Sequence, residues 1–211
     1  MGWTFFHKPK GKKAIATMRE QLGEEWCAKH VVAESATREA VFHVIKMHAP
    51  ESGVYVPDAD GFVRAIGVTK IRNVPRARDG YNFGYKDMTE TMGPYGLECP
   101  PSIIAAASEL RDPIGPQPEY SSLRSAREYR ERSLVASKAK ASKRALKVGT
   151  KIKLPKPLSF GGVKLDEFTV ERCRVRGRKG LSTVFRSVVT GGLYGLSAMD
   201  LIGATEAKET A

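Results

Sequence analysis

The sequence predicts an α+β protein: a mixed α/β domain with a β-sheet, a basic helical linker, and a small all-β domain. Three observations favour this architecture. The chain has 211 residues, enough for one ordinary domain or two small ones. Its hydrophobic fraction of 41% is typical of a globular protein. Finally, the spacing of apolar residues changes along the chain, from mixed helical and alternating periods before residue 111 to alternation after residue 146.

Residues 1–110 are expected to form the mixed α/β domain. A helix is predicted over 11–23, because Ile15, Met18 and Leu22 recur three to four residues apart and Gly23 follows as a stop. Stretches rich in Val, Ile and aromatic residues predict strands, and "PPSIIAAASEL" predicts a short helix that opens with proline. The predicted strands are "GWTFF" (2–6), "WCAKHVVAE" (26–34), "REAVFHVIKMH" (38–48), "GFVRAIGVTKIRN" (61–73) and "GYNFGYKDM" (80–88).

Residues 111–145 are expected to form a junction. Three prolines and a glycine in "RDPIGPQPE" (111–119) block both helix and ladder. The next residues, 121–145, are helical by content, but their apolar stripe is thin and consists of Leu123, Ala126, Tyr129 and Val135. A helix with so little to bury is either solvent-exposed or packed on something outside itself.

Residues 146–204 predict a small β-barrel. In "LKVGTKIKL" apolar and lysine residues alternate, which is the period of a half-buried strand. Four further short strands follow, at "LSF", "DEFTVERCRV", "STVFRSVV" and "GLYGLS". Five short strands in so short a stretch favour an SH3-like or OB-like barrel, since closure removes exposed edges. Residues 205–211 are expected to be a disordered tail.

The net charge of +12 is concentrated in one stretch of the chain. Residues 120–180 hold 18 Lys and Arg against five acids, whereas the rest holds 17 basic and 18 acidic residues. Such a field favours polyanions, by steering and by counterion release from phosphates. A solvated charged surface is the alternative interpretation. The residues predicted to bind nucleic acid are Arg124, Arg127, Arg130, Lys151, Lys153, Arg172, Arg174, Arg176, Arg178 and Lys179.

The segment "GYNFGYKDMTETMGP" (80–94) gives the candidate catalytic residues. Lys86, Asp87 and Glu90 lie where a predicted strand runs out into a turn, and such loops commonly carry function. They would bind a phosphate or a metal-phosphate, or act as a general acid and base. Tyr81 and Tyr85 would stack on a base. The alternative is an aromatic core strand with a solvated Lys–Asp pair, because no known catalytic spacing is matched.

Cysteine and histidine spacing predicts neither a disulfide framework nor a metal site. The three cysteines are scattered and odd in number, as expected for reduced thiols. The Cys27–His30 and His43–His48 pairs fit no standard zinc spacing, and along strands the members of each pair face opposite sides. No cofactor is predicted. No membrane span or secretory signal is visible, so we expect a cytoplasmic protein.

A family resemblance rests on four stretches: the opening "MGWTF", the segment "GYNFGYKDMTETMGP", the "CPPSI" behind it and the late "PLSF…DEF". Together they resemble a group of small uncharacterised proteins encoded by phages, prophages and plasmids. The resemblance implies a mobile-element setting in a bacterial host cell and draws attention to the 80–94 segment. It implies no chemistry and transfers no catalytic role.

These observations lead to three hypotheses of function. The first is a mobile-element accessory protein that binds nucleic acid, or a nucleic-acid-bound host complex, mainly through phosphate contacts. DNA and RNA are not distinguished, because no base-reading signature is visible. The second is an enzyme acting on a nucleotide or nucleic acid at the 86–90 loop. The third is a protein-interaction module that inhibits a host defence or replication factor. Alanine at Lys86 and Asp87 would separate the first two, and a nuclease-resistant host partner would indicate the third.

Overall fold

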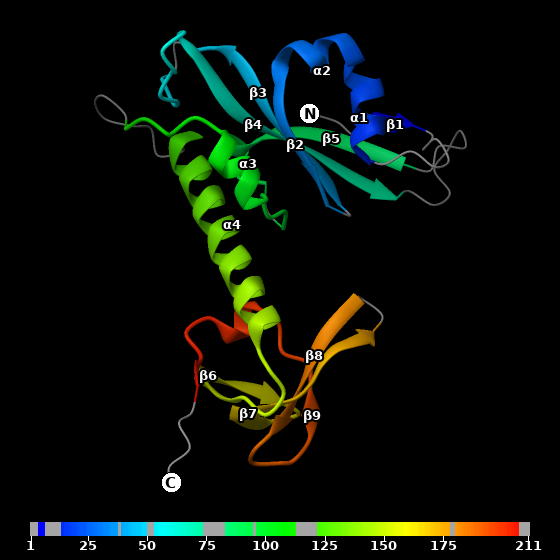
Figure 1. The fold of residues 1–211 in the computed structure, drawn as a ribbon, viewed down its shortest axis with the longest axis vertical. Coiled ribbons are helices and arrows are strands. Elements are labelled where there is room, and N and C mark those ends of the chain that lie inside the picture. Colours follow the sequence, from blue (N-terminus) through cyan, green and yellow to red (C-terminus); the bar gives the residue numbers. More distant parts are fainter. Residues whose placement is uncertain are drawn as a thin grey trace. The chain divides into compact units, whose positions relative to one another are not determined.

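The computed structural model describes residues 4–6, 14–37, 39–49, 53–73, 83–94, 96–112, 122–177 and 180–206 (Figure 1). The chain divides into two compact units, residues 1–134 and residues 135–211. The division falls inside the longest helix, α4 (Ser122–Ala145), so each unit contains one end of that helix. Among the described residues, no helix is long and apolar enough to cross a membrane.

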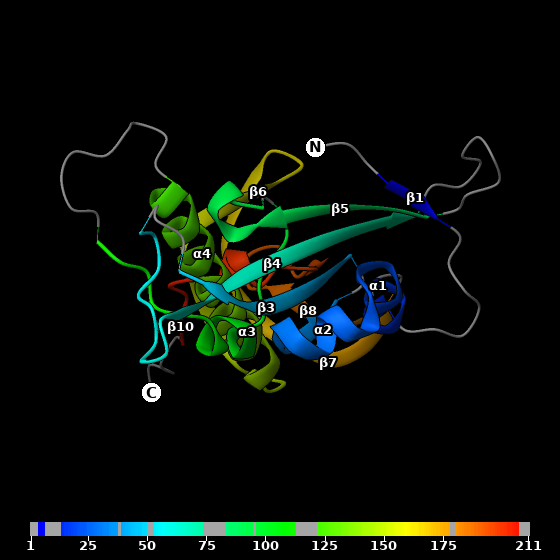
Figure 2. The same ribbon diagram turned by 90° about the horizontal axis from the view of Figure 1, so that it is seen from above.

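The first unit contains a five-stranded antiparallel sheet with the strand order β1-β5-β4-β3-β2. Its strands fan out with the usual twist when seen from above (Figure 2). The strands are β1 (Thr4–Phe6), β2 (Val31–Ala36), β3 (Ala40–His48), β4 (Phe62–Asn73) and β5 (Phe83–Thr89). The alternating sequences at 38–48 and 61–73 therefore form the expected strands, and they pair with each other over nine residues of register.

Helices cover both faces of this sheet, which explains why the first five residues of β3 are all buried. The helices α1 (Ala14–Leu22) and α2 (Glu24–His30) lie on one face, and α3 (Pro101–Ala106) lies on the other with the first part of α4 (Figure 1). Because side chains alternate along a strand, Phe42 and Val44 point to the α3 face and His43 points to the α1–α2 face.

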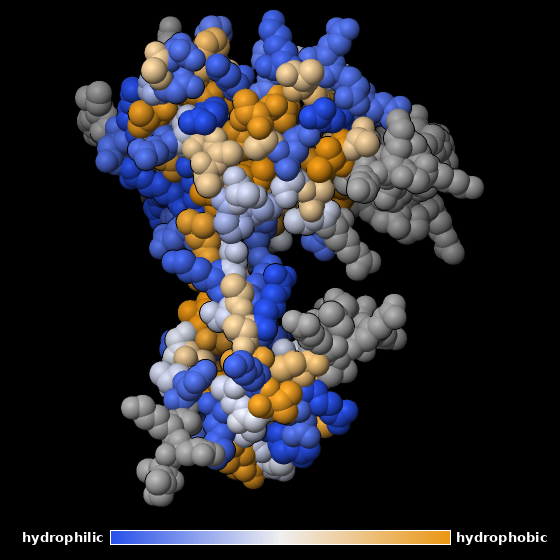
Figure 3. Space-filling view, viewed as in Figure 1, coloured by the Kyte–Doolittle hydropathy of each residue, from blue (hydrophilic) through white to orange (hydrophobic). Residues whose placement is uncertain are grey.

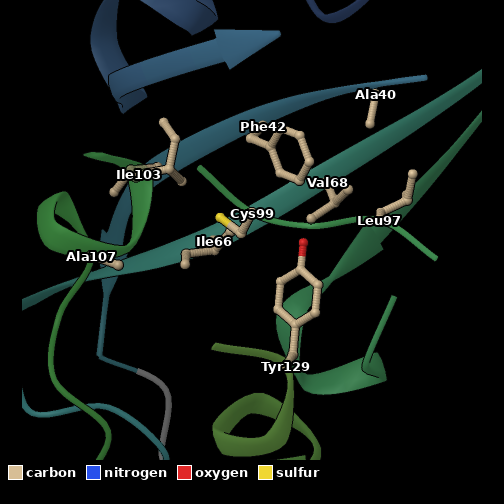
Figure 4. Close-up of a cluster of buried hydrophobic side chains, with 10 residues drawn as sticks. Ala40, Phe42, Ile66, Val68, Leu97, Cys99, Ile103, Ala107 and Tyr129 are labelled. Atoms are coloured by element: carbon tan, nitrogen blue, oxygen red, sulfur yellow. The ribbon is translucent and has the colours of Figure 1, made fainter. Parts of the chain in front are cut away.

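The core on the α3 face joins the sheet to α4. Phe42, Ile66 and Val68 pack with Ile103 of α3 and with Tyr129, whose ring rises from α4 toward the sheet (Figure 4). The thin apolar stripe of α4 thus has a partner: its members Leu123, Ala126 and Tyr129 are buried, whereas Val135 is exposed.

The second unit contains another five-stranded antiparallel sheet, in the order β10-β6-β7-β8-β9. Its core is apolar and includes Ile152, Phe168 and Phe185. The strand pairings among the described residues leave this sheet open between β9 and β10, so they do not confirm the expected closed barrel. The strands are β6 (Lys151–Phe160), β7 (Val163–Gly177), β8 (Gly180–Ser187), β9 (Leu193–Tyr194) and β10 (Thr205–Glu206).

Three local predictions need correction. Residues 26–30 are helical in α2 instead of extended, and the strand begins only at Val31. The charged residues favour a helix here, because the glutamates in its first turn and Lys29 and His30 in its last turn interact favourably with the helix dipole. The alternating apolar and lysine residues from 146 onward do not begin a strand at residue 146. A turn at 148–149, with Gly149 at φ 87°, precedes β6. Thr205–Glu206 pairs with β6 instead of belonging to a disordered tail.

Candidate functional site

The three candidate catalytic residues are not brought together. Lys86 and Asp87 are neighbours on β5, so their side chains project from opposite faces of the sheet. Asp87 is exposed and accepts a hydrogen bond from the Thr69 hydroxyl, with Oγ1 and Oδ1 2.7 Å apart. Lys86 is directly opposite Lys70 of β4 in the register. Glu90 begins the 3₁₀ helix η2 (Glu90–Met92), where its side chain is fully buried.

Glu90 is the acceptor of a buried cluster built by three distant parts of the chain. Arg130 of α4 contacts it with two guanidinium nitrogens: Nε is 2.6 Å from Oε2 and Nη2 is 2.8 Å from Oε1. The Tyr55 hydroxyl donates to Oε1 at 3.0 Å. Arg130 also donates through Nη1 to the Ser108 carbonyl at 2.9 Å. Both oxygens of the Glu90 carboxylate thus accept hydrogen bonds from protein donors.

The electrostatics of this cluster are those of a structural ion pair. Burial works against the Arg130 charge, but hydrogen bonds from Arg130 to Glu90 keep the pKa of Arg130 above its ordinary value. Burial, reinforced by the Glu90 charge, raises the pKa of the Tyr55 hydroxyl, so Tyr55 stays protonated and donates. Since the Arg130 side chain is only 13% exposed and that of Glu90 is inaccessible, neither can reach a ligand in solution. The cluster fixes the first part of α4 to the rest of the first unit.

Of the predicted stacking residues, Tyr81 lies outside the described part of the chain. Tyr85 belongs to β5, where its backbone pairs with Thr4 of β1 and Ile71 of β4. The direction of its side chain lies outside what the structure describes.

The basic residues at the start of α4 are already paired with acids. Arg124 forms an ion pair with Glu128 one turn later, with Nε and Oε1 2.8 Å apart. Arg127 forms an ion pair with Asp112. Together with the buried Arg130, these predicted nucleic-acid contacts have carboxylate partners within the first unit, which weakens their attraction for phosphate.

The outward face of the second sheet is partly neutralised in the same way. Lys153 of β6 and Glu167 of β7 are opposite each other in the register, with Nζ and Oε1 2.8 Å apart. Arg186 of β8 donates two hydrogen bonds to the Glu171 carboxylate of β7, each with a nitrogen–oxygen distance of 2.9 Å. Lys151 is exposed on β6 and also has an interaction partner.

A group of cations without such pairing lies where the chain leaves α4. We name Arg144, Lys147 and Arg172 the basic corner. The chain segments that carry Lys147 and Arg172 contact each other: the Cys173 thiol donates to the Leu146 carbonyl at 3.3 Å, and the Gly149 amide donates to the Val170 carbonyl at 2.8 Å. All three side chains are exposed, and none forms an ion pair with an acidic residue in the described part of the chain.

The distal half of β7 continues from this corner. Arg174 and Arg176 belong to that strand by their backbone, while Arg178 and Lys179 lie outside the described residues. Register shifts between Val170 and Arg172, and again between Arg172 and Val175, interrupt regular pairing with β8. The simple alternation expected for 172, 174 and 176 therefore does not extend through the strand.

The second unit carries most of the excess positive charge. Residues 135–211 hold 16 Lys and Arg against six Asp and Glu, a balance of +10 out of the +12 of the whole chain. Hydrophilic residues cover much of the visible surface of this unit, with hydrophobic residues between them (Figure 3). The charge expected from the sequence is therefore concentrated on a folded unit with its own core.

The first unit contains a pocket that the sequence did not indicate. His43, discounted above as a metal ligand, is buried and lines a pocket together with Asp87 and Trp26. Its position on the α1–α2 face of β3 follows from alternation. The pocket itself depends on helix packing that the sequence pattern does not reveal.

Residues 121–199 match a sequence family described as a domain of unknown function, DUF6927. The match covers α4 and most of the second sheet. No curated protein and no solved structure matches the chain significantly.

Proposed function

We propose that the second unit binds nucleic acid through phosphate contacts centred on the basic corner. The observation that carries this proposal is the balance of +10 within residues 135–211, combined with exposed cations at the corner that form no ion pair with a described acid. A phosphate backbone supplies closely spaced negative charges, and each contact with Lys or Arg releases condensed counterions. Contacts of this kind position a protein without reading sequence.

The ion pairs narrow the proposed surface relative to the sequence prediction. Arg130 is excluded because it is buried against Glu90, and Arg124, Arg127 and Lys153 have carboxylate partners. The binding surface then consists of the corner and the basic residues of distal β7.

Lys143, next to the corner, has a different role. Its ammonium donates to the Leu196 carbonyl and lies 5.9 Å from the centre of the Phe185 ring. Burial lowers the pKa of this lysine, against the opposing charge of Asp200. We assign Lys143 to the packing of α4 on the second unit's core, apart from the binding surface.

The cellular setting in this proposal is that of an accessory protein of a phage, prophage or plasmid, acting in the cytoplasm of a bacterial host. Its support is the resemblance carried by the opening residues and by the 80–94 segment. A nucleic-acid-bound host complex would offer the same phosphates, and the proposal includes it as a partner.

A pair of charge-matched variants tests the proposal. Lys147→Ala/Arg172→Ala removes two cations from the corner, and Lys29→Ala/Arg111→Ala removes two exposed cations from the first unit. Binding to duplex and single-stranded DNA and RNA is measured by fluorescence anisotropy over a range of salt concentrations. The corner variant should weaken binding and flatten the salt slope by about two units, one for each lost phosphate contact. Equal effects of the two variants would refute a localised surface.

A further inference from the structure

The first unit holds a pocket of about 280 Å³ between the helices α1 and α2 and the sheet. Leu22 of α1, Trp26 of α2 and Ile45 of β3 form apolar walls. Polar groups come from three strands: His43 of β3, Thr69 of β4 and Asp87 of β5. A largely apolar cavity with a few converging polar groups is the usual form of a small-molecule site, and this volume suits a ligand of one or two rings.

His43 lines this pocket with an unused hydrogen-bonding group. The residue is 2% exposed, and neither ring nitrogen has a hydrogen-bond partner among the described residues. Nδ1 is 3.4 Å from Glu34 Oε1, without the geometry of a hydrogen bond. Burial lowers the pKa of His43, against the opposing charge of Glu34, so the ring is neutral near neutral pH. A buried polar atom without a partner is destabilising, and a ligand would satisfy it.

Asp87 supplies the charge of the pocket. Apart from His43, it is the only acidic or basic residue among the described residues that line the cavity. Its Oδ1 accepts the Thr69 hydroxyl at 2.7 Å, which orients the carboxylate, and no described lysine or arginine pairs with it. A carboxylate without a cationic partner accepts hydrogen bonds from N–H donors, and such bonds are stronger when a group is charged.

Trp26 gives the pocket an aromatic wall. The residue is 41% exposed, a large fraction for a residue type that is highly buried on average. The ring lies against the imidazole of His30, with centroids 5.0 Å apart. The remaining indole surface is open to a planar ligand. The face of an indole ring attracts the positive edge of another aromatic ring, or a cation.

We propose that this pocket binds a small planar aromatic ligand that has an amidine-like N–H edge. Benzamidine and guanine are examples of molecules with such an edge. The N–H edge would meet the Asp87 carboxylate, the ring would lie against Trp26, and His43 would take up a further hydrogen bond. The site is separate from the basic corner, and its existence does not depend on nucleic-acid binding by the second unit.

Three probes of nearly equal shape test the charge preference: benzamidine (cationic), benzamide (neutral) and benzoate (anionic). The chain has two tryptophans, so Trp3→Phe leaves Trp26 as the sole tryptophan in the full-length protein, and excitation selective for tryptophan then reports on this site. Benzamidine should quench Trp26 saturably and bind at least about tenfold more tightly than benzamide, a difference of about 1.4 kcal/mol. Benzoate should bind most weakly. Equal binding of the three probes, or no saturable binding, would overturn the proposal.

Two further variants locate the site. Asp87→Asn keeps the size of the side chain and an acceptor for Thr69, and it should abolish the preference for benzamidine over benzamide. The matched control, Glu39→Gln, neutralises an exposed acid that does not line the pocket and should leave the preference unchanged. If Asp87→Asn unfolds the unit, Trp26→Ala with calorimetric titration replaces it, because loss of the indole should weaken benzamidine binding at least about tenfold. Unchanged binding in the folded variant would contradict the assignment.

Discussion

Neutralising Glu90 should destabilise the first unit far more than neutralising an exposed glutamate. Glu90→Gln keeps an acceptor for Tyr55 but leaves the buried Arg130 guanidinium without a counter-charge, where it now has two contacts of 2.6 and 2.8 Å. Removing one partner of a buried ion pair typically lowers the unfolding free energy by about 3–5 kcal/mol. Arg130→Met, which leaves the carboxylate unpaired, should have an effect of the same size.

The double variant Glu90→Gln/Arg130→Met gives the sharper test. With both charges removed, the desolvation penalty disappears, so the double variant should be less destabilised than the sum of the single variants. We expect a coupling energy of about 2–3 kcal/mol, near the upper end for contacting residues. The matched control is Glu128→Gln, which breaks the exposed Glu128–Arg124 pair and should change the unfolding free energy by less than about 1 kcal/mol.

Urea unfolding followed by tryptophan fluorescence measures these quantities. Both tryptophans belong to residues 1–134, so the signal reports the first unit even when the two units unfold separately. Single variants that lose less than about 1 kcal/mol, or strictly additive losses in the double variant, would refute a structural role for this ion pair.

Three further outcomes follow from buried groups. Because burial lowers the pKa of His43 below 6.5, the unfolded chain binds a proton that the folded chain does not. The unfolding free energy should therefore fall as the pH drops below about 6.5, and His43→Phe should reduce that slope in urea titrations at several pH values. A thiol reagent should react first with the half-buried Cys173, since Cys27 and Cys99 are buried and burial raises the pKa of Cys99 to about 12; Cys173→Ser should remove the fast phase. Ser133→Ala leaves the buried Cys99 amide without its acceptor at 3.0 Å, and thermal unfolding should show a loss of about 1–3 kcal/mol.

Local patterns predicted the strands of the first sheet well. The alternating stretches became β3 and β4, because a two-residue period places one set of side chains on each face whatever the sheet packs against. The β-branched residues after His30 led to the prediction of one strand over 26–34, which wrongly included residues 26–30. These residues form α2, whose Cys27 is buried, and such a tertiary contact is not registered by counting sequence periods.

The candidate site was harder to predict because its contacts are distant in sequence. Glu90 follows a strand and precedes Gly93, so locally it has the pattern of a polar loop. Its burial requires Arg130, forty residues later on a different helix. The same contact removes Arg130 from the expected binding surface, although the sequence shows it only as one arginine in a basic helix. The pocket at Asp87 likewise depends on how α1 and α2 lie over the sheet.

The proposed function depends most directly on one measurement, a salt titration of wild-type binding to duplex DNA. If the three cations of the basic corner each neutralise one phosphate, the logarithm of the binding constant should fall with the logarithm of salt concentration with a slope of about −2.7 or steeper. Single-stranded DNA and RNA should show a somewhat shallower dependence at equal contact number. A slope near zero, or no binding to any of these polymers at low salt, would contradict the assignment of the second unit as a nucleic-acid-binding surface.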